Sequence, residues 1–286
     1  MSAAAFVYTT VLRRPLLRRA ANAALRAIIP QTVERHGARI VLNPADPVVS
    51  GALTLRVYEP NETEFFLAAC RPEMTLLDIG ANVGYYTALA LARTRGNARV
   101  VAVEPDPETF QYLLRTVAAN PGASVDCVAK AVSDRNGTGI LHTSRGNRGD
   151  SRLYANELAD GSCPVQLVRL DDLLDDLRIA RVDLVKIDVQ GYEAHVLAGM
   201  QRTIECSPQL VILSEFWPHG IRAAGRDPRA YLADLAARGM RLYELHKHRR
   251  LAAIADFDRL IAEHPGRDYA NIVAVKGPLP PDVCAE

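Results

Sequence analysis

The chain has 286 residues, of which 49% are hydrophobic, and its formal net charge is +1. This length and composition predict one large α/β domain with a small appendage, in a soluble globular protein. The near-zero charge argues against a surface that attracts nucleic acid over its whole area, and the absence of any run approaching about 18 apolar residues excludes a membrane span.

Residues 1–30 differ from the rest because they contain five arginines and no acid. The arginines follow the apolar stretch Ala3–Leu12, whereas a signal peptide places its positive charges first. We predict that residues 1–45 form a basic, helical N-terminal extension and that residues 46–286 form the large α/β domain. The extension either packs on the domain or, through Arg13–Arg26, contacts an anionic membrane surface peripherally.

Two weaker patterns lead into the domain. Residues 31–57 indicate short strands or loops, with Arg39–Leu42 as a candidate edge strand. Asn61, followed by Glu64 three residues later, then has the spacing of a capping box and predicts the start of a helix that ends near Pro72.

The stretch Thr75–Thr87, TLLDIGANVGYYT, predicts a buried strand, a glycine turn over Gly80–Gly84 and a helix. This arrangement presents backbone N–H groups and a helix N-terminus to a bound cofactor. We expect Asp78, at the end of the strand, to point an acceptor into the same crevice. The turn lacks one glycine of the dinucleotide pattern G-x-G-x-x-G. A pyrophosphate would fit poorly beside Asp78, whereas a sulfonium with an α-ammonium group would be favoured.

A second apolar run, Arg99–Val103, ends in Glu104-Pro105-Asp106. An acidic residue that closes the second strand of such a unit can accept hydrogen bonds from both hydroxyls of a ribose. The first half of the chain is therefore predicted to bind a cofactor that carries a nucleoside.

The middle of the chain continues the alternation of strands and helices, with a helix after Pro107 and strands over Ser124–Val128, Gly139–Thr143 and Val165–Arg169. Residues 144–163 are polar, glycine-rich and without periodicity. Because this stretch separates the cofactor strands from the next central strand, we predict a loop that faces the substrate.

Val182–Ile187 predicts a central strand that is closed by Asp188, and a turn then leads to Glu193 in the first turn of a helix. In an open parallel sheet, ligands bind beyond the carboxyl ends of the strands where the strand order reverses. We therefore expect Asp188 and Glu193 to face Gly80–Gly84 and to act in catalysis. Lys186, on the face of Asp188, is expected to form a salt bridge with a neighbouring acid.

The next strand, Gln209–Ser214, ends in Glu215-Phe216-Trp217-Pro218-His219. Glu215 and His219 are further candidates for a general base. Trp217 either stacks on an apolar face of the substrate or fills the rim of the domain. The tail predicts helices over 230–238 and 256–263 with strands Met240–Leu245 and Asn271–Lys276.

The five cysteines are odd in number, widely spaced and never form C-x-x-C; they are Cys70, Cys127, Cys163, Cys206 and Cys284. This pattern is typical of reduced thiols, and it predicts a cytoplasmic protein without a disulfide framework or a zinc site. Mg²⁺ remains possible, but no cluster of metal ligands is indicated among the acidic residues Asp171, Asp172, Asp183 and Asp188.

The chain resembles the FkbM family of S-adenosylmethionine-dependent methyltransferases. The resemblance rests on three motifs that occur in this order: DIGANVGYYT, AVEPDP and VDLVKIDVQGYEAHVLAGM. It covers roughly residues 58–218. The resemblance implies a Rossmann-like class I methyltransferase fold. That fold has a mostly parallel sheet of about seven strands, an antiparallel C-terminal hairpin and helices on both faces.

The resemblance also implies that Tyr58 or Glu62 touches the cofactor and that residues 131–134 cover its adenine. With the motifs above, the expected cofactor-binding residues are Asp78, Gly80, Asn82, Gly84, Tyr85, Glu104, Pro105, Asp106, Ala131, Val132, Ser133 and Asp188. The expected catalytic residues are Asp188, Glu193, Glu215 and His219.

The implied activity is O-methylation of a sugar, a glycan or glycolipid, or a natural product, and the sequence does not choose among these acceptors. Two other enzyme classes share parts of the pattern, namely NAD-dependent oxidoreductases and nucleic-acid methyltransferases. A cofactor-binding protein without catalysis is a third alternative. The absence of a basic and aromatic stripe argues against nucleic acid as a partner, and the sequence does not predict an oligomeric state.

Overall fold

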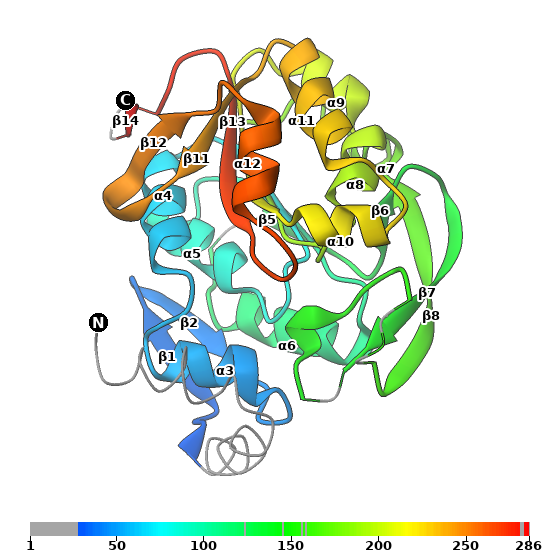
Figure 1. The fold of residues 1–286 in the computed structure, drawn as a ribbon. Coiled ribbons are helices and arrows are strands. Elements are labelled where there is room, and N and C mark those ends of the chain that lie inside the picture. Colours follow the sequence, from blue (N-terminus) through cyan, green and yellow to red (C-terminus); the bar gives the residue numbers. More distant parts are fainter. Residues whose placement is uncertain are drawn as a thin grey trace.

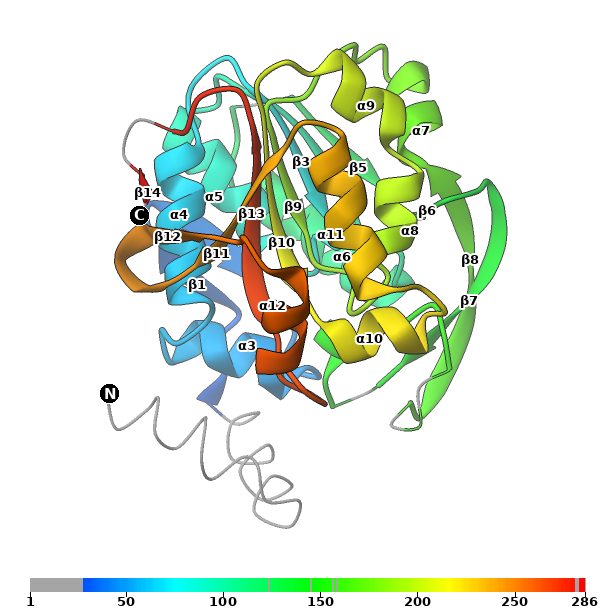
Figure 2. The same cartoon turned by 45° about the horizontal axis from the view of Figure 1, so that its top comes forward.

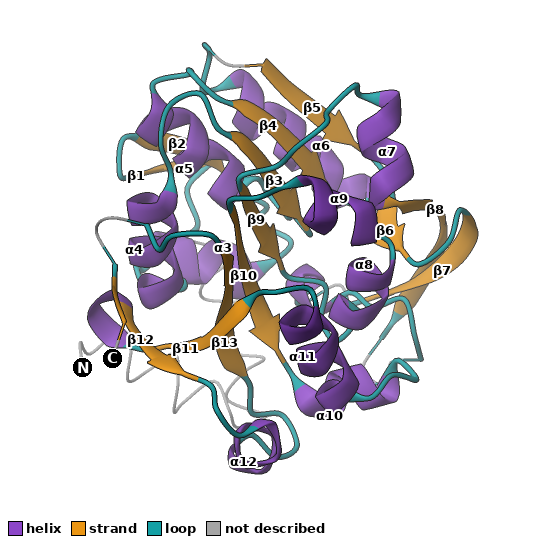
Figure 3. Ribbon diagram, turned by 90° about the horizontal axis from the view of Figure 1, so that it is seen from above, coloured by secondary structure: helices purple, strands orange, loops and turns teal. Residues whose placement is uncertain are grey.

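The computed structural model describes residues 28–122, 124–144, 146–155, 157, 159–280 and 283–285. The basic extension over residues 1–27, with its predicted helix and membrane contact, lies outside this part. Within the described residues, the central feature is one twisted sheet of nine strands in the order β14-β12-β11-β13-β10-β9-β3-β4-β5 (Figures 1 and 3). In chain order these strands are β3 (Thr75–Ile79), β4 (Arg99–Val103), β5 (Ser124–Val128), β9 (Leu184–Ile187), β10 (Leu210–Phe216), β11 (Arg241–Leu245), β12 (Arg250–Ala253), β13 (Ala270–Lys276) and β14 (Cys284–Ala285).

Five neighbouring strands, β5, β4, β3, β9 and β10, run parallel. Of these, β3, β4, β9 and β10 consist of short apolar runs that are buried on both faces, as parallel strands between two layers of helices require, whereas β5 at the edge is partly exposed. β13 is antiparallel to both β10 and β11 and supplies the predicted C-terminal hairpin. The predicted sheet of about seven strands is therefore confirmed, and β12 and β14 extend its edge beyond β11.

Helices cover both faces of the sheet (Figure 2). One apolar core lies under α4 (Pro60–Ala69) and α5 (Tyr85–Thr94), with α6 (Pro107–Ala118) beside them. The core on the other face is formed by α7 (Leu170–Asp176), α8 (Glu193–Ala198), α9 (Gln201–Cys206), α10 (Pro218–Ala223), α11 (Pro228–Ala237) and α12 (Phe257–Glu263). No helix among the described residues has the length and apolar character that crossing a membrane requires.

The strand order reverses between β3 and β9. The chain passes from β3 outward to β4 and β5, and it later returns to β9 and moves outward in the opposite direction to β10. Connections leave this point in opposite directions and open a crevice beyond the carboxyl ends of the strands.

A separate three-stranded sheet stands at the side of the molecule, in the order β6-β8-β7 (Figure 2). Its strands are β6 (Ala131–Ser133), β7 (Gly137–Thr143) and β8 (Gly161–Arg169). The predicted loop over 144–163 is thus shorter than expected, because its last three residues already pair in β8. The connection includes a short 3₁₀ helix, η2 (Arg148–Asp150).

The part before the central sheet agrees with the expectation in one respect and differs in another. Residues Thr32–Arg35 (β1) and Ala38–Val41 (β2) form an antiparallel hairpin, as the short strands predicted over residues 31–57 suggested. The side chain of Ile40 is fully buried in the same core as α4 and α5. The next helix, α3 (Pro47–Thr54), was not predicted; Asp46 caps it by accepting from the backbone N–H groups of residues 48 and 49. The proposed boundary at residue 46 therefore falls within packed structure.

The start of α4 also differs from the prediction. The helix begins at Pro60, so Asn61 lies inside it and no capping box forms. The N-cap residue is Glu59, whose backbone is left-handed (φ 38°, ψ 58°) and whose side chain makes no capping hydrogen bond. The side chain of Glu59 therefore does not cap α4 and can make contacts elsewhere.

Candidate active site

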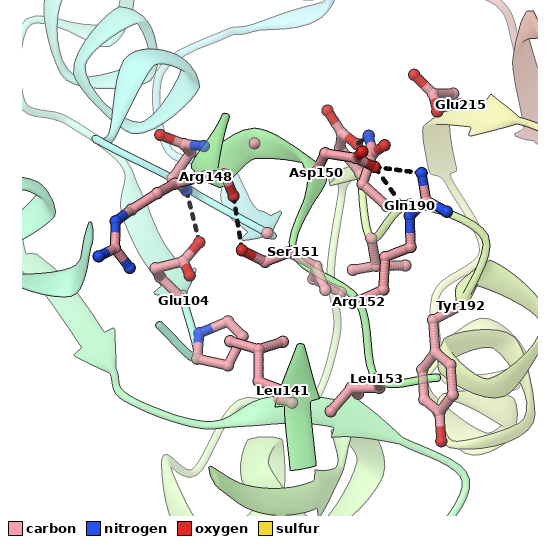
Figure 4. A pocket seen from close by; sticks show the side chains of 18 of the residues that line it. Glu104, Leu141, Arg148, Asp150, Ser151, Arg152, Leu153, Gln190, Tyr192 and Glu215 are labelled. Atoms are coloured by element: carbon pink, nitrogen blue, oxygen red, sulfur yellow. Dashed lines mark hydrogen bonds and ion pairs between the residues drawn. The ribbon is translucent and has the colours of Figure 1, made fainter. Parts of the chain in front are cut away.

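A cavity of about 330 Å³ lies beyond the carboxyl ends of β3, β4, β9 and β10 (Figure 4). The segment Asn147–Leu153 and helix α3 border it on the side opposite the sheet. Of the residues expected to bind cofactor or act in catalysis, those that line the cavity are Gly80, Asn82, Glu104, Pro105, Ala131, Val132, Asp188 and Glu215.

Four of these residues form a row along the edge of the sheet. The last paired residues of the strands are Ile79 with Val103, Ile79 with Ile187, and Ser214 with Ile187. The residue that follows on each strand is consequently Glu104, Gly80, Asp188 and Glu215, in this order from β4 to β10. Adjacent strands are about 4.8 Å apart, so the row spans roughly 14 Å.

Glu104 is held rigidly at one end of this row. Its two carboxylate oxygens accept from the backbone N–H groups of Asn82 (2.9 Å) and Asp106 (2.8 Å). Burial raises the pKa of Glu104 to about 8. A carboxylate with fixed orientation at this place can accept hydrogen bonds from vicinal hydroxyls.

The glycine loop comes very close to the end of β9. A Cβ atom on Gly80 would lie 1.9 Å from the carbonyl oxygen of Asp188, and the φ angle of Gly80 is +82°. Only glycine fits here. The close approach brings the two halves of the sheet edge together under the cavity.

Asp78 does not line the cavity, contrary to the prediction. Its carboxylate accepts from the backbone N–H (2.9 Å) and the hydroxyl (2.6 Å) of Thr87, in the first turn of α5. The N-cap residue of α5 is Gly84, which has no side chain to do this. Asp78 therefore satisfies the helix N-terminus from the neighbouring strand and fixes the position of the loop.

A cluster of carboxylates surrounds one buried cation at the other end of the row. The ammonium of Lys186 lies 4.0 Å from the carboxylate of Glu59 and 3.8 Å from that of Asp188. Burial opposes the charge of Lys186, but the surrounding carboxylates, Glu59 first, outweigh burial and raise its pKa. The prediction that Lys186 pairs with a neighbouring acid is confirmed.

The acids of this cluster are strongly affected by their surroundings. Burial, together with the charge of Asp188, raises the pKa of Glu215 well above its usual value. Burial raises the pKa of Glu59 to about 7, although Lys186 lowers it. Such groups can hold or accept a proton near neutral pH, which a general base requires.

Glu193 lies beneath the cavity and not in it. Its side chain is fully buried and accepts from the backbone N–H groups of Gly191 (3.0 Å) and Val189 (3.4 Å). Burial raises the pKa of Glu193 to about 7. In this structure Glu193 supports the turn that follows Asp188, and its expected catalytic role stays a prediction.

Five more predicted residues lie outside the cavity lining. His219 is exposed, and its ring centroid lies 5.7 Å from that of Trp217. Asp106 caps α6, and Ser133 supports the pocket residue Tyr192 through its hydroxyl (3.3 Å). The remaining two are Gly84, the N-cap residue of α5, and Tyr85, its first residue.

The resemblance to the family implied that Tyr58 or Glu62 touches the cofactor. Tyr58 lines the cavity, whereas Glu62 lies outside it and accepts from the side chain of Asn271. Sequence patterns missed Glu59 and Arg148, which both line the cavity. For Glu59, its position directly before Pro60 was an available signal.

Arg148 joins the segment Asn147–Leu153 to the remainder of the site. Its guanidinium donates to the carboxylates of Asp106 (2.6 Å) and Glu108, and its backbone N–H faces the carboxylate of Asp46. In Figure 4, this segment lies between Glu104 and Glu215. The predicted loop over 144–163 thus contributes a wall of the cavity.

Trp217 lines the cavity and is held by two contacts. The guanidinium of Arg152 lies 4.6 Å from the centre of the indole ring, and the indole N–H donates to the carbonyl of Gly266 (2.7 Å). Both predicted alternatives for Trp217, stacking on the substrate and filling the rim, stay predictions.

No group of three or more histidine, cysteine or acidic residues within the described ranges could hold a metal ion. The carboxylates of the site are instead arranged around Lys186 and backbone N–H groups.

The nine-stranded sheet of the described residues, with its antiparallel strand β13 and a cavity over its reversal point, is the Rossmann-like class I methyltransferase fold. The family model described as the methyltransferase FkbM domain matches residues 78–246. The chain belongs to this family.

Two curated relatives indicate the range of the family. The 2-O-methyltransferase NoeI of Sinorhizobium fredii is 31% identical over 149 residues, which is 47% of this chain and 60% of that protein. The hexuronic acid methyltransferase AglP of Haloferax volcanii is 24% identical over 147 residues, 51% of this chain and 58% of that protein. The matches thus span about three fifths of the length of these relatives.

Among solved structures, an O-methyltransferase from Bacillus cereus in complex with SAH is similar to this chain. It is 15% identical, the match covers 96% of both chains, and the TM-score is 0.45.

Proposed function

We propose that this chain is an S-adenosylmethionine-dependent O-methyltransferase that acts on a hydroxyl group of a sugar, a glycan or glycolipid, or a natural product. The row Glu104, Gly80, Asp188 and Glu215 carries the proposal, because it combines an anchor for a ribose with an acidic end that favours a cationic ligand. The family match and the names of the two relatives, both methyltransferases, support it.

The residues present fit this cofactor. The cavity volume of about 330 Å³ lies within the range of roughly 300–1,000 Å³ that is usual for small-molecule sites. Glu104 would accept from the ribose hydroxyls. Ala131, Val132 and Leu141 line the same cavity and would provide an apolar surface for the adenine.

When bound, S-adenosylmethionine supplies a methyl group that is already activated on a sulfonium sulfur. The main task of the chain is then to align the acceptor hydroxyl, and alignment of two reactants lowers a barrier by about 7–11 kcal/mol. A general base contributes about 10²–10⁴-fold. Alignment therefore contributes more to the rate than the base does.

The acidic end of the row would bind the acceptor hydroxyl. Asp188 accepts from the side-chain amide of Gln190 (2.9 Å), which fixes the orientation of its carboxylate. Asp188 or Glu215 would orient the hydroxyl and take its proton. The raised pKa of Glu215, caused first by burial, makes this group the stronger proton acceptor once it is ionised. The neighbouring segment Asn147–Leu153 would exclude water from this end.

The first experiment is mass spectrometry of the purified protein for co-bound S-adenosylmethionine or its demethylated product. Transfer of labelled methyl groups to a panel of sugars, glycolipids and natural-product alcohols follows. We expect bound cofactor and transfer to at least one hydroxyl. For that acceptor, Asp188→Asn or Glu215→Gln lowers kcat by about 10²–10⁴-fold, according to which residue is the base. Full turnover of both variants at neutral pH would contradict the base assignment but not methyl transfer.

Binding and transfer experiments on the same purified protein distinguish the alternative functions. Binding of a nicotinamide dinucleotide in place of S-adenosylmethionine would favour an oxidoreductase. Retention of RNA at low salt, with methyl transfer to it, would favour a nucleic-acid methyltransferase. Retained cofactor without transfer to any acceptor would favour a non-catalytic binding protein.

A further inference from the structure

A cofactor with an α-ammonium group requires a partner for that charge, and the sequence pattern offered Asp78. One oxygen of the Asp78 carboxylate, Oδ2, accepts from both the N–H and the hydroxyl of Thr87, and Asp78 does not line the cavity. A carboxylate that does line the cavity is therefore better placed for this role.

The position of the ribose restricts the choice. If the ribose lies on Glu104, the sulfur lies near Gly80 and the amino-acid end extends toward Asp188, along the row of about 14 Å across the sheet edge. In Figure 4, Glu104 and Glu215 lie on opposite sides of the cavity. The carboxylates of the lining at the far end are those of Glu59, Asp150, Asp188 and Glu215, and that of Asp150 accepts from the guanidinium of Arg152 (2.8 Å).

Glu59 has an unusual backbone for a residue in this position. Its φ angle is 38° and it directly precedes Pro60, where the extended region is strongly preferred. A residue at the N-cap normally turns its side chain back to the helix, but Glu59 makes no such hydrogen bond. Strain of this kind is retained where the surroundings require it, and it concentrates at ligand sites.

The side chain of Glu59 is held in place from the rear. The hydroxyl of Tyr86 donates to one carboxylate oxygen (2.6 Å), and the ammonium of Lys186 lies 4.0 Å from the same oxygen. A carboxylate that is positioned by a phenol and a lysine is prepared to bind a cation with fixed geometry.

The charges at this end leave room for a cationic group. Four carboxylates lie around the ammonium of Lys186, and one of them, that of Glu62, accepts from the side chain of Asn271. Asp188 and Glu215 stand in the row and are the two candidates for binding the acceptor hydroxyl. Glu59 comes from α4, outside the row.

We propose that Glu59 binds the α-ammonium group of S-adenosylmethionine. The inference rests on the proposed function and adds a cofactor-binding residue to it. Loss of one charge-assisted hydrogen bond lowers affinity by about tenfold to a hundredfold.

The test compares two adenosine thioethers by calorimetry on the full chain. The first, 5′-(3-aminopropylthio)adenosine, carries the amine and no carboxylate. The second, 5′-methylthioadenosine, carries neither group. Wild-type protein should bind the aminopropyl compound about tenfold to a hundredfold more tightly. Glu59→Gln should remove this preference and leave the affinity for methylthioadenosine nearly unchanged.

Glu104→Gln is the matched control, because it should weaken both compounds equally and keep the preference. A preference that survives in Glu59→Gln, or one that is lost in Glu215→Gln instead, would overturn the proposal. So would a wild-type protein that binds both compounds equally. If neither compound nor S-adenosylmethionine binds wild-type protein, the proposed function itself fails.

Thermal unfolding of each variant verifies the fold. If Glu59→Gln does not fold, Glu59→Asp decides the question, because aspartate tolerates a left-handed backbone better than most residues. Its shorter side chain should reduce the preference for the amine while the affinity for methylthioadenosine is kept. An unchanged preference in Glu59→Asp would contradict the assignment.

Discussion

At the scale of single residues, the carboxylates of the site divide into those that support the backbone and those that face the cavity. Glu193 belongs to the first group, since it accepts from the backbone N–H groups of Gly191 and Val189. Its second carboxylate oxygen is buried without a hydrogen-bond partner among the described residues. Such a group favours the protonated state.

This burial predicts a pH dependence of stability that Glu193→Gln removes. The folded-state pKa of about 7 lies above the ordinary value of 4.5, so Glu193 contributes stability that is fully present below pH 4.5 and is lost as the pH rises through 7. The free energy of unfolding of the wild type, minus that of the variant, should fall over this interval by up to about 3 kcal/mol, at 1.36 kcal/mol per pKa unit. Urea unfolding at a series of pH values measures it. A difference that stays constant with pH would show that Glu193 titrates normally.

The sequence predicted which residue types form the site, but it did not predict the directions in which their side chains point. Gly80, Asn82, Glu104 and Asp188 line the cavity as expected, because a strand that ends in a tight turn fixes where these positions lie. The sequence did not show that Asp78 lies outside the lining, because its partner, Thr87, is nine residues away and becomes a neighbour only when α5 folds back. Side-chain orientation depends on such tertiary contacts.

At the scale of elements, the segment Asn147–Leu153 and helix α3 act as one wall of the cavity, and Arg148 connects them. Its guanidinium is largely buried and bonds to Asp106 and Glu108, while Asp46 caps α3 and faces the Arg148 backbone. Gly149 fits against the side chain of Val49, since a Cβ atom there would lie 2.9 Å from it. The wall is thus held by one cation among three acids.

Arg148→Ala should loosen this wall and weaken cofactor binding. Removing one partner from a buried ion pair leaves the remaining charge uncompensated and costs about 3–5 kcal/mol. We expect faster amide hydrogen exchange over residues 146–153 and lower affinity for S-adenosylmethionine, with partial recovery in Arg148→Lys.

The control is Arg229→Ala, whose partner Asp258 is exposed, as is Arg229 itself. An exposed pair contributes about 0–1 kcal/mol, so this variant should bind and exchange like the wild type. If Arg148→Ala shows the same exchange rates and affinity as Arg229→Ala, the wall does not depend on Arg148.

Elements were predictable where the pattern is local and regular. The strand–glycine–helix unit over Thr75–Thr87 and the strand before Asp188 were predicted because short apolar runs and glycine turns specify them directly. Helix α3 was not predicted, because the stretch that forms it has no clear apolar periodicity. Its start was indicated only by Asp46 followed by Pro47. The start of α4 was misplaced because Asn61 and Glu64 imitate a capping box inside the helix.

At the scale of the whole molecule, the sheet order explains why one chain brings distant carboxylates together. Glu104 and Glu215 are separated by 111 positions in the sequence, yet they stand on strands β4 and β10, on either side of the reversal point. The hairpin β1–β2 takes part in the same arrangement, since it packs on α5 and α6, the helices that follow β3 and β4. The core that supports the site therefore begins ahead of the proposed domain boundary at residue 46.

Two isoleucines test this extent of the core with the same chemical change. Ile40 in β2 is fully buried, whereas Ile140 in β7 is 50% exposed. Ile40→Ala should lower the free energy of unfolding by about 2–5 kcal/mol, because it leaves a cavity in the packed core. Ile140→Ala should change it by no more than about 0.5 kcal/mol. Denaturant unfolding with a single cooperative transition in both variants would place the hairpin in the folding unit of the sheet. An Ile40→Ala variant as stable as Ile140→Ala would instead place the hairpin outside that unit, and the boundary at residue 46 would stand.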